Sequence, residues 1–231
     1  MNIIVNGGTR GIGKEIVLIL AKERSNQVLV TGRNSNALRQ LSSEAKHRNI
    51  FTHTTDLAVF DDHEKSFTDA VRGYFTDVDI LINNAGYLVC MDFTDFNAKE
   101  ARKLMETNFF GPASVIRVLR PMMKRGSHIV NISSMGGYQG SSKYRGMSYY
   151  SASKAALSCL SECLAGEFRE AGIIVNCLAL GSVQTEMFEE AFPGHNAPVN
   201  AKEMAQFIAD FAMNGNKFFN GKVIPVAFSD P

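Results

Sequence analysis

The 231-residue chain contains no tryptophan, only six prolines and only four cysteines. The cysteines are Cys90, Cys159, Cys163 and Cys177, and they show neither CxxC spacing nor the cysteine and histidine spacing of a metal site. Each stands among apolar or helix-forming residues, where thiols usually stay reduced and buried. We therefore expect buried free thiols, a reducing compartment and no metal site.

The chain also has no large excess of charge of either sign, because 24 lysines and arginines balance 23 aspartates and glutamates and leave a formal net charge of +1. A chain without a basic excess has little general attraction for nucleic acid or an anionic membrane, so we expect neither as a partner. No apolar run reaches membrane-spanning length, and the chain opens on the strand-like Ile3-Ile4-Val5. We therefore predict no membrane span, no signal peptide and a cytoplasmic location.

The residues that are present indicate one α/β domain over residues 1–231. A content of 45% hydrophobic and 20% charged residues is sufficient for one full core at this length. Short apolar segments alternate with segments of helical periodicity, which predicts a sheet covered by helices. The expected strands are 2–6, 27–31, 50–54, 79–82, 127–132, 173–178 and 222–226, and the expected helices are 15–24, 37–48, 57–75, 98–124 with a break at Gly111-Pro112, a helix containing Tyr150, and 201–213.

The first strand runs directly into a glycine-rich turn, Gly7-Gly8-Thr9-Arg10-Gly11-Ile12-Gly13, and then into a helix. Glycines permit a tight turn and close approach of the backbone to a phosphate, and the free N–H groups at a helix start favour negative charge. The order of strand, glycine turn and helix therefore predicts a dinucleotide phosphate site. A turn that is merely tight is the alternative.

The second strand ends in Gly32-Arg33-Asn34 rather than in the aspartate or glutamate that would bind a ribose 2′-hydroxyl. Arg33 and Arg10 place two cations where a 2′-phosphate would lie, and a carboxylate there would repel it. We therefore predict NADP(H) in preference to NAD(H). The alternative is that both arginines are solvated loop charges.

Tyr150 and Lys154 are four residues apart in a segment rich in alanine and leucine, so they share one face of the predicted helix. A nearby ammonium stabilises a phenolate, and lowering a tyrosine pKa from ~10 to ~7 requires about 4 kcal/mol of differential interaction. One lysine supplies part of this interaction energy. The pair is a candidate acid and its activator, and an ordinary helix-surface pair is the alternative.

Polar residues also follow or interrupt apolar segments at four further places. Asn83-Asn84-Ala85-Gly86 follows the fourth strand, and Ser133-Ser134 ends the fifth. Ligands bind at the carboxyl edge of doubly wound sheets, but amides and hydroxyls there also serve as turn and cap residues. Asn108 lies in an apolar helix and needs a hydrogen-bonding partner. Asp56 is expected to cap the third helix, with an adenine contact as the alternative.

Residues 182–200, here called the substrate loop, contain Phe188 and Phe192 together with the turn formers Pro193 and Gly194. We expect this segment to cover a substrate beside the ligand edge. His195 has no second histidine, cysteine or acid spaced to join it. Its position predicts a surface or loop residue rather than a base or ligand.

These motifs, in this order, resemble those of the short-chain dehydrogenase/reductase family, in its compact single-domain branch, over nearly the whole chain. The resemblance implies a Rossmann-type doubly wound parallel sheet in three αβα layers, with strand order 3-2-1-4-5-6 and a seventh edge strand. The implied catalytic residues are Asn108, Ser134, Tyr150 and Lys154. The implied cofactor-binding residues are Gly7, Thr9, Arg10, Gly11, Ile12, Gly13, Arg33, Asp56, Leu57, Asn84, Ala85, Gly86, Tyr150, Lys154, Gly181, Val183 and Thr185.

The resemblance also implies a reaction. Hydride passes from NADPH to a carbonyl carbon, Tyr150 donates a proton to the oxygen, and Ser134 hydrogen-bonds the same oxygen. Lys154 is expected to lower the tyrosine pKa and hold the nicotinamide ribose, and Asn108 to hold a water that connects the lysine to solvent. The expected substrate is a small carbonyl compound or alcohol. Because family members pair the helices that correspond to residues 98–124 and 150–171, we expect a homodimer or homotetramer.

The chain departs from the family pattern at several positions. Asn6 stands where most members have threonine, and Leu180 stands where most have proline, which leaves the following loop freer. The loop before the tyrosine helix is longer than in the family, and Ser141-Ser142-Lys143-Tyr144-Arg145 occupies the excess. The two cations of this loop either contact an anionic substrate or are solvated surface charges.

Three functions are consistent with the sequence. The leading one is an NADPH-dependent carbonyl reductase or alcohol dehydrogenase. A 3-oxoacyl carrier-protein reductase ranks below it, because Ala171 stands where that group usually places a basic residue to hold the acidic carrier, although Lys124 and Arg125 are available to compensate. A non-catalytic NADP-binding sensor or scaffold is the third, and the intact catalytic set counts against it.

Overall fold

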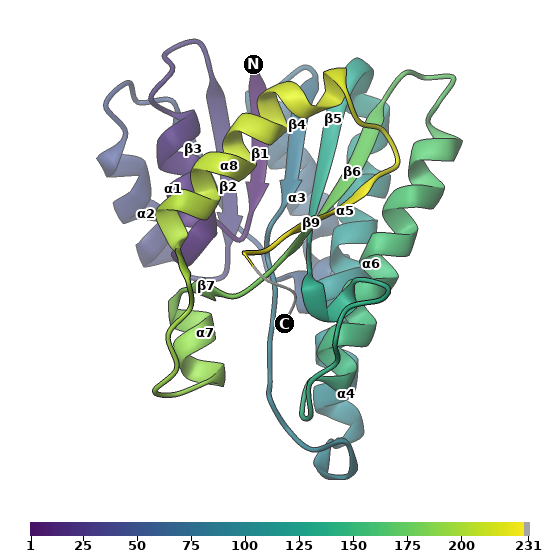
Figure 1. Ribbon diagram of the computed structural model, residues 1–231. Helices are drawn as coiled ribbons and strands as arrows, with labels where there is room; N and C mark the ends of the chain where they lie inside the picture. Colours follow the sequence, from purple (N-terminus) through teal and green to yellow (C-terminus); the bar gives the residue numbers. More distant parts are fainter. Residues whose placement is uncertain (229–231) are drawn as a thin grey trace.

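Seven parallel strands form the central sheet of the computed structural model, which describes residues 1–228 (Figure 1). Their order, β3-β2-β1-β4-β5-β6-β9, confirms the doubly wound arrangement with a seventh edge strand. The end of the expected domain 1–231, residues 229–231, lies outside the described part. The strands are β1 Asn2–Asn6, β2 Gln27–Gly32, β3 Ile50–Thr54, β4 Val78–Asn83, β5 Met123–Ser134, β6 Ile174–Leu180 and β9 Val223–Val226.

Helices cover both faces of the sheet, which confirms the three-layer architecture. Side chains alternate along a strand, so Ile3 and Val5 pack into one helical layer and Ile4 into the other. In Figure 1, α1, α2 and α8 lie over one face, and α3, α5 and α6 lie behind the other. The helices are α1 Gly11–Leu20, α2 Ser35–Glu44, α3 Phe60–Tyr74, α4 Ala98–Met105, α5 Gly111–Leu119, α6 Ser148–Glu167, α7 Glu186–Ala191 and α8 Ala201–Asn214.

A chain of buried side-chain hydrogen bonds crosses the sheet just before its carboxyl edge. Thr31, Asn6, Asn83 and Asn131 stand in register on β2, β1, β4 and β5. Thr31 donates to Asn6 at 2.7 Å, and Asn6 donates to Asn83 at 2.8 Å. Asn83 donates to Asn131 at 2.8 Å, and Asn131 donates to Ser161 of α6 at 2.9 Å. Asn6 therefore joins three strands through both ends of its amide, which shows how this departure from the family pattern is accommodated.

The expected helix 98–124 is divided into α4, a π-helical turn over Glu106–Phe110, and α5. Pro112 has no N–H to donate to the carbonyl of Asn108, four residues earlier, which explains why the regular ladder is lost in this turn. A side chain at Gly111 would come within 2.6 Å of the Leu57 carbonyl oxygen, so the glycine lets the turn pack closely. The break therefore begins one turn earlier than the sequence predicted.

The substrate loop contains regular structure. Its strands β7 (Val183–Gln184) and β8 (Val199–Asn200) pair in parallel, and α7 lies between them. Thr185 caps α7 by accepting a hydrogen bond from the Phe188 N–H at 3.2 Å. In Figure 1, α7 projects beyond the carboxyl edge of the sheet. The sequence predicted only a loop here, because elements this short produce no readable periodicity.

The four cysteines are free thiols, but only Cys177 is buried. The expectation of buried thiols was therefore wrong for Cys90, Cys159 and Cys163, which are exposed. Cys159 and Cys163 are four residues apart on the outer face of α6, whereas Leu157 faces the core. Apolar neighbours in sequence do not decide which side of a helix a residue occupies. Within residues 1–228, no helix combines the length and the apolar character that crossing a bilayer requires.

Candidate active site

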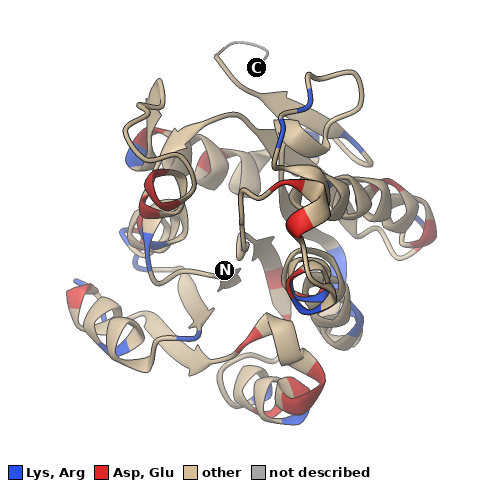
Figure 2. Ribbon diagram, turned by 90° about the horizontal axis from the view of Figure 1, so that it is seen from below, with Lys and Arg blue, Asp and Glu red and all other residues tan. Residues whose placement is uncertain are grey.

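A cavity of about 650 Å³ opens where β1, β2, β4, β5 and β6 reach the carboxyl edge of the sheet. Figure 2 looks onto this edge and shows charged residues mainly on the surrounding helices. The predicted site residues that line the cavity are Gly7, Thr9, Arg10, Gly11, Ile12, Gly13, Arg33, Asn84, Ala85, Gly86, Ser134, Tyr150, Lys154, Gly181, Val183 and Thr185. Asn108, Asp56 and Leu57 are not part of this lining.

The glycine turn between β1 and α1 forms one end of the cavity. Gly7 has a φ of 79°, which residues with side chains rarely adopt, and its N–H donates to the Thr31 carbonyl at 2.9 Å. A Cβ on Gly13 would lie 2.1 Å from the Gly7 carbonyl oxygen. Arg10, just before α1, makes no side-chain cap, so N–H groups of the first helical turn are left for a ligand. The turn fits a dinucleotide pyrophosphate.

The loop after β4 packs directly against this turn. The Asn84 side chain donates to the Gly7 carbonyl at 2.9 Å, and a Cβ on Gly7 would lie 2.5 Å from the Ala85 Cα. The two backbones therefore approach more closely than side chains would allow. Asn84 and Ala85 hold the glycine turn in place from the neighbouring strand end, which explains the small residues of this motif.

Two arginines lie at the end of the cavity nearest β2. Arg33 follows the last residue of β2, and Arg10 lies in the glycine turn. The Arg10 guanidinium is paired with Glu190 of α7, with nitrogen-to-oxygen distances of 2.5 and 3.2 Å. This pairing raises the pKa of Arg10 and lowers that of Glu190. Sequence reasoning missed Glu190, because nothing local indicates a contact between residues so far apart in the chain.

Asp56 has the capping role that the sequence favoured. Its side chain accepts a hydrogen bond from the Ala58 N–H at 3.0 Å and caps the 3-10 turn Leu57–Val59. The predicted cofactor contacts of Asp56 and Leu57 stay predictions, because neither residue lines the cavity.

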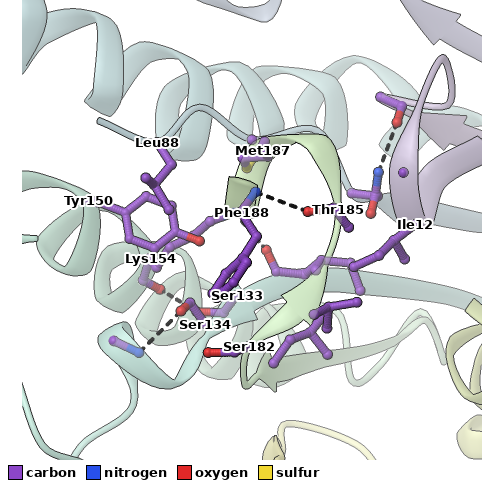
Figure 3. Close-up of a pocket in the computed structure, with 18 of the residues that line it drawn as sticks. Ile12, Leu88, Ser133, Ser134, Tyr150, Lys154, Ser182, Thr185, Met187 and Phe188 are labelled. Atoms are coloured by element: carbon purple, nitrogen blue, oxygen red, sulfur yellow. Dashed lines mark hydrogen bonds between the residues drawn. The ribbon is translucent and has the colours of Figure 1, made fainter. Parts of the chain in front are cut away.

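Tyr150 and Lys154 occupy the inner face of α6, where they are 9% and 3% exposed. The Lys154 Nζ lies 6.0 Å from the centre of the Tyr150 ring and donates to the Ile132 carbonyl at 2.9 Å. Figure 3 shows the Tyr150 ring at the cavity wall, with its hydroxyl directed inward. The two side chains share a face as predicted, but the ammonium is held by the end of β5.

Burial dominates the protonation equilibria of this pair. It raises the pKa of Tyr150 above its ordinary value, and a hydrogen bond with Ser134 opposes the rise. Burial also lowers the pKa of Lys154 to about 8, against an opposing interaction with Cys177. Lys154 is not among the groups that shift the pKa of Tyr150 here, so its expected effect on the phenol stays a prediction.

The two serines at the end of β5 face different partners. Ser133 donates to the Lys154 carbonyl at 2.8 Å and accepts from Ser158 at 2.9 Å, which ties β5 to α6. Ser134 accepts a hydrogen bond from the Gly136 N–H at 3.1 Å and caps the short turn Met135–Gly137. Its hydroxyl proton can still be donated toward the cavity. Ser134 thus serves both as a cap and as a cavity residue.

Asn108 is fully buried in the π-helical turn. Its Oδ1 accepts from the Tyr87 N–H at 2.7 Å, and its Nδ2 donates to the Tyr87 carbonyl at 2.8 Å and to Ser153 Oγ at 2.9 Å. Both amide protons are therefore used within the protein. A Cβ built on Gly86 would be 3.4 Å from the Lys154 Nζ and 3.7 Å from the Asn108 Oδ1. Asn108 accordingly borders Lys154 without reaching the cavity.

Sequence reasoning also missed part of an apolar wall at the Tyr150 end of the cavity. Leu88, Met147 and Met187 line this wall together with the predicted Phe188 and Phe192. None of the missed residues belongs to a periodic pattern. Their only signal in the sequence is closeness to a predicted site residue, since Leu88 follows the Asn-Asn-Ala-Gly turn and Met147 immediately precedes α6.

Comparisons with known proteins agree with this geometry. A family model described as short chain dehydrogenase matches residues 1–196. Mouse dehydrogenase/reductase SDR family member 7B is 35% identical over 192 residues, which cover 80% of this chain and 58% of that protein. The chain thus spans less than two thirds of that relative. The 3-oxoacyl-[acyl-carrier-protein] reductase FabG of Escherichia coli K12 is 30% identical over 240 aligned residues, with 96% of this chain and 94% of that protein covered.

A solved structure shares the fold over almost its full length. It is that of a short chain dehydrogenase from Burkholderia cenocepacia J2315 in complex with NADP, with a TM-score of 0.87 and 24% sequence identity. The match covers 97% of this chain and 95% of that chain.

Proposed function

The chain belongs to the short-chain dehydrogenase/reductase family, and on that premise we propose that it is an NADP(H)-dependent oxidoreductase that interconverts a carbonyl compound and a secondary alcohol. One observation carries the proposal. Tyr150, Ser134 and Lys154 meet at one end of a cavity whose other end is the glycine turn. A protein that only sensed a dinucleotide would need the turn but not an acid beside it.

Tyr150 is the proposed general acid and base. Its hydroxyl is directed into the cavity, which Ser134 also lines, so two hydroxyl groups are available to one substrate oxygen. In reduction, the Tyr150 proton passes to that oxygen, and in oxidation the phenolate takes a proton from the alcohol. When bound, the cofactor supplies or accepts the hydride.

Lys154 is proposed to hold the cofactor ribose and to keep a positive charge close to the phenol. An ammonium has three donors, and the Ile132 carbonyl uses one of them. A pKa of about 8 leaves the amine mainly protonated at pH 7. Its charge then stabilises the phenolate as the proton leaves, which partly offsets the effect of burial on Tyr150.

Asn108 is proposed as a positioning residue next to Lys154. Its amide holds the Tyr87 backbone and Ser153, so it sets the path of the chain after Gly86. Because both amide protons are used, a water relay from Lys154 to solvent would depend on the Asn108 backbone carbonyl rather than on its side chain.

The preference for NADP(H) is supported by the charges near the end of β2. Arg33 and Arg10 line the cavity, and glycine occupies the last position of β2, where a carboxylate would favour a 2′-hydroxyl. A 2′-phosphate would replace Glu190 as the partner of Arg10. The start of α1 supports a bound pyrophosphate, because Arg10 makes no side-chain cap there and N–H groups of the first turn stay available.

A 3-oxoacyl carrier-protein reductase is the second candidate, favoured by the similarity to FabG. The charges for an acidic carrier are not near the cavity. Lys124 is paired with Asp77 and Asp79, and Arg125 donates to a backbone carbonyl. Both residues lie near the start of β5, where the strand bulges, and the regular part from His128 to Ser134 alone extends about 20 Å.

We also propose that the protein self-associates as a dimer or tetramer and works in the cytoplasm. Phe207, Phe218 and Phe219 are exposed aromatic side chains near α8 and β9, and such side chains favour association. The exposed free thiols fit a reducing compartment. Size-exclusion chromatography with light scattering tests the first point, and a monomer at micromolar concentration would contradict it.

The experiment that tests the function is NADPH oxidation with a panel of ketones, ketosugars, quinones and 3-oxoacyl thioesters, with Tyr150→Phe alongside. Turnover that disappears in a variant that still binds NADPH is the expected result. Equal turnover in the variant would contradict the mechanism, and a clear preference for the acyl thioesters would favour the second candidate. NADPH binding without turnover on any of these compounds would favour the sensor.

A further inference from the structure

The Tyr150 end of the cavity has mainly apolar walls. Leu88, Met147, Met187, Phe188 and Phe192 line it. They come from three separate segments: the loop after β4, the end of the loop before α6, and α7 with the residue that follows it. In Figure 3, Leu88 lies beside Tyr150, and Met187 and Phe188 lie across the cavity from it. A group next to the reacting carbonyl therefore has hydrocarbon or aromatic surface available to contact.

These walls contact one another and are not isolated side chains. Phe192 packs against the cluster formed by Leu104, Met147 and Tyr150. Its ring also lies 5.3 Å from that of Phe188, between ring centres. α7 thereby closes against the Tyr150 side of the cavity through aromatic contacts, and the site presents a continuous apolar surface to a substrate.

The cations near this end of the cavity already have partners. Arg145 lines the mouth and forms a two-point ion pair with Asp92, in which Nε donates to Oδ1 at 2.7 Å and Nη2 donates to Oδ2. The Lys143 Nζ donates to the Tyr138 carbonyl and to Ser141 Oγ, both at 2.7 Å, and Lys143 does not line the cavity. An anionic substrate at this loop would therefore have to displace Asp92 from Arg145, while Lys143 lies outside the cavity lining.

The remaining charges act against an anion. Lys154 is buried against the Ile132 carbonyl and is assigned to the cofactor. α7 carries three carboxylates, at Glu186, Glu189 and Glu190, and Glu186 lines the cavity. A substrate carboxylate or phosphate would lose hydration and gain a cation only by displacing Asp92 from Arg145, so its binding carries an electrostatic cost. A neutral apolar group loses little and gains the contacts of the walls.

We infer that the substrate is an uncharged ketone or aldehyde that carries an aryl or similarly bulky apolar group next to its carbonyl. This inference rests on the proposed function, since it assigns the apolar wall to the compound that Tyr150 protonates. Reduction transfers a hydride from NADPH to the carbonyl carbon and the Tyr150 proton to the oxygen, so the products are NADP⁺ and a neutral secondary or primary alcohol.

A matched pair of probes tests the charge, and binding is measured beside turnover because an ester also activates the adjacent ketone more than a carboxylate does. Methyl benzoylformate and benzoylformate share the aryl ketone, and only the second carries a negative charge. We expect kcat/KM for the ester to exceed that for the acid by at least about tenfold, because the acid must bury an unpaired charge. Equal values, or a preference for the acid, would overturn the inference.

Two variants connect this preference to the named residues. Phe188→Ala should lower kcat/KM for the ester about fivefold or more through a higher KM, whereas Tyr74→Ala, a truncation at a half-exposed tyrosine of α3 that does not line the cavity, should leave it unchanged. Asp92→Asn frees Arg145 and should narrow the gap between ester and acid. If Phe188→Ala left the ester value unchanged, the apolar wall would not be the substrate site.

Binding to Tyr150→Phe loaded with NADPH separates the inference from the proposed function. The ester should quench bound-NADPH fluorescence at lower concentration than the acid. Tighter ester binding without any turnover in the wild type would retain the substrate class and overturn the proposed reduction. Tighter binding of the acid, or binding of neither probe, would overturn the substrate class.

Discussion

Glu190 of α7 forms an ion pair with Arg10 of the glycine turn at 2.5 Å. Both side chains are largely exposed, so the pair contributes little to the stability of the fold. Its position gives it another consequence, because it joins the substrate loop to the proposed cofactor site. Under the proposed function the same guanidinium binds the 2′-phosphate, so Glu190 and NADPH would compete for Arg10.

Removing this carboxylate should therefore tighten NADPH binding. We expect Glu190→Gln to lower the NADPH dissociation constant about threefold at low salt, as is typical for an exposed ion pair, and to change the NADH dissociation constant less. Fluorescence titration of the bound nicotinamide measures both. Glu189→Gln is the matched control, since Glu189 is a neighbouring acid of α7. Weaker NADPH binding in Glu190→Gln would show that Glu190 supports the cofactor instead.

Tyr150 should be required for turnover but not for cofactor binding. Loss of a general acid typically costs about 100- to 10,000-fold in rate, and we expect Tyr150→Phe to lower kcat within that range. Its NADPH dissociation constant should stay within about twofold, because one hydroxyl is removed from a large contact surface. Tyr149→Phe is the control, since the adjacent ring packs against Phe93 and Phe96 instead. Comparable losses in both variants would point to damage of α6.

The affinity for NADPH should depend on pH through Lys154. The pKa of this lysine is lowered to about 8 by burial, so the amine loses its charge as the pH rises through that value. NADPH carries negative charge, and we expect its dissociation constant to rise between pH 7 and 9.5. Lys154→Met should bind more weakly at pH 7 and show a flatter profile, whereas Lys143→Met should retain the wild-type slope. A steep profile in Lys154→Met would assign the titration to another group.

Stability at acid pH should depend on His128. This buried ring lies 2.9 Å from the Ala212 carbonyl through Nδ1 and 3.1 Å from the Asn176 amide nitrogen through Nε2. The neutral ring can donate at the first contact and accept at the second. Burial lowers its pKa from 6.5 to about 4. Between these values the unfolded chain binds more protons than the folded protein, so stability falls as the pH drops.

Between pH 7 and pH 5, His128 should lower the free energy of unfolding by about 2 kcal/mol. Urea unfolding at both pH values measures it. His128→Gln should be less stable at pH 7 but should lose less on acidification, whereas His195→Gln, at an exposed position in the substrate loop, should retain the wild-type pH dependence. An unchanged pH dependence in His128→Gln would assign the acid sensitivity elsewhere.

The glycine turn should not tolerate a methyl group at Gly13. Its Cβ would lie 2.1 Å from the Gly7 carbonyl oxygen and 2.4 Å from the Asn84 amide nitrogen, so one of the two loops must move. We expect Gly13→Ala to abolish measurable NADPH binding. Gly166→Ala is the control, because its Cβ meets nothing within 4 Å on the exposed face of α6. That change should stabilise the protein by about 0.5–1 kcal/mol without altering NADPH affinity.

The local features of the site could be predicted because they depend on short stretches of chain. The strand before Gly7, the cap at Asp56 and the four-residue spacing of Tyr150 and Lys154 each follow from geometry within one or two turns. The break near Gly111-Pro112 was also visible, although the π-helical turn was not. The regular structure of the substrate loop was missed because its strands and helix are too short for a periodic pattern.

The sequence by itself determined the order of strands and helices, the glycine turn and the identity of the chemical groups, because these depend on residue type and on neighbours along the chain. Only the tertiary structure decided what each group contacts. In the folded protein Glu190 forms an ion pair with Arg10, and Lys154 donates to the Ile132 carbonyl. Arg145 pairs with Asp92, and Cys159 is exposed on the outer face of α6. These contacts depend on how separate elements pack, and loss of hydration in that packing also sets the direction in which the pKa of Tyr150 moves.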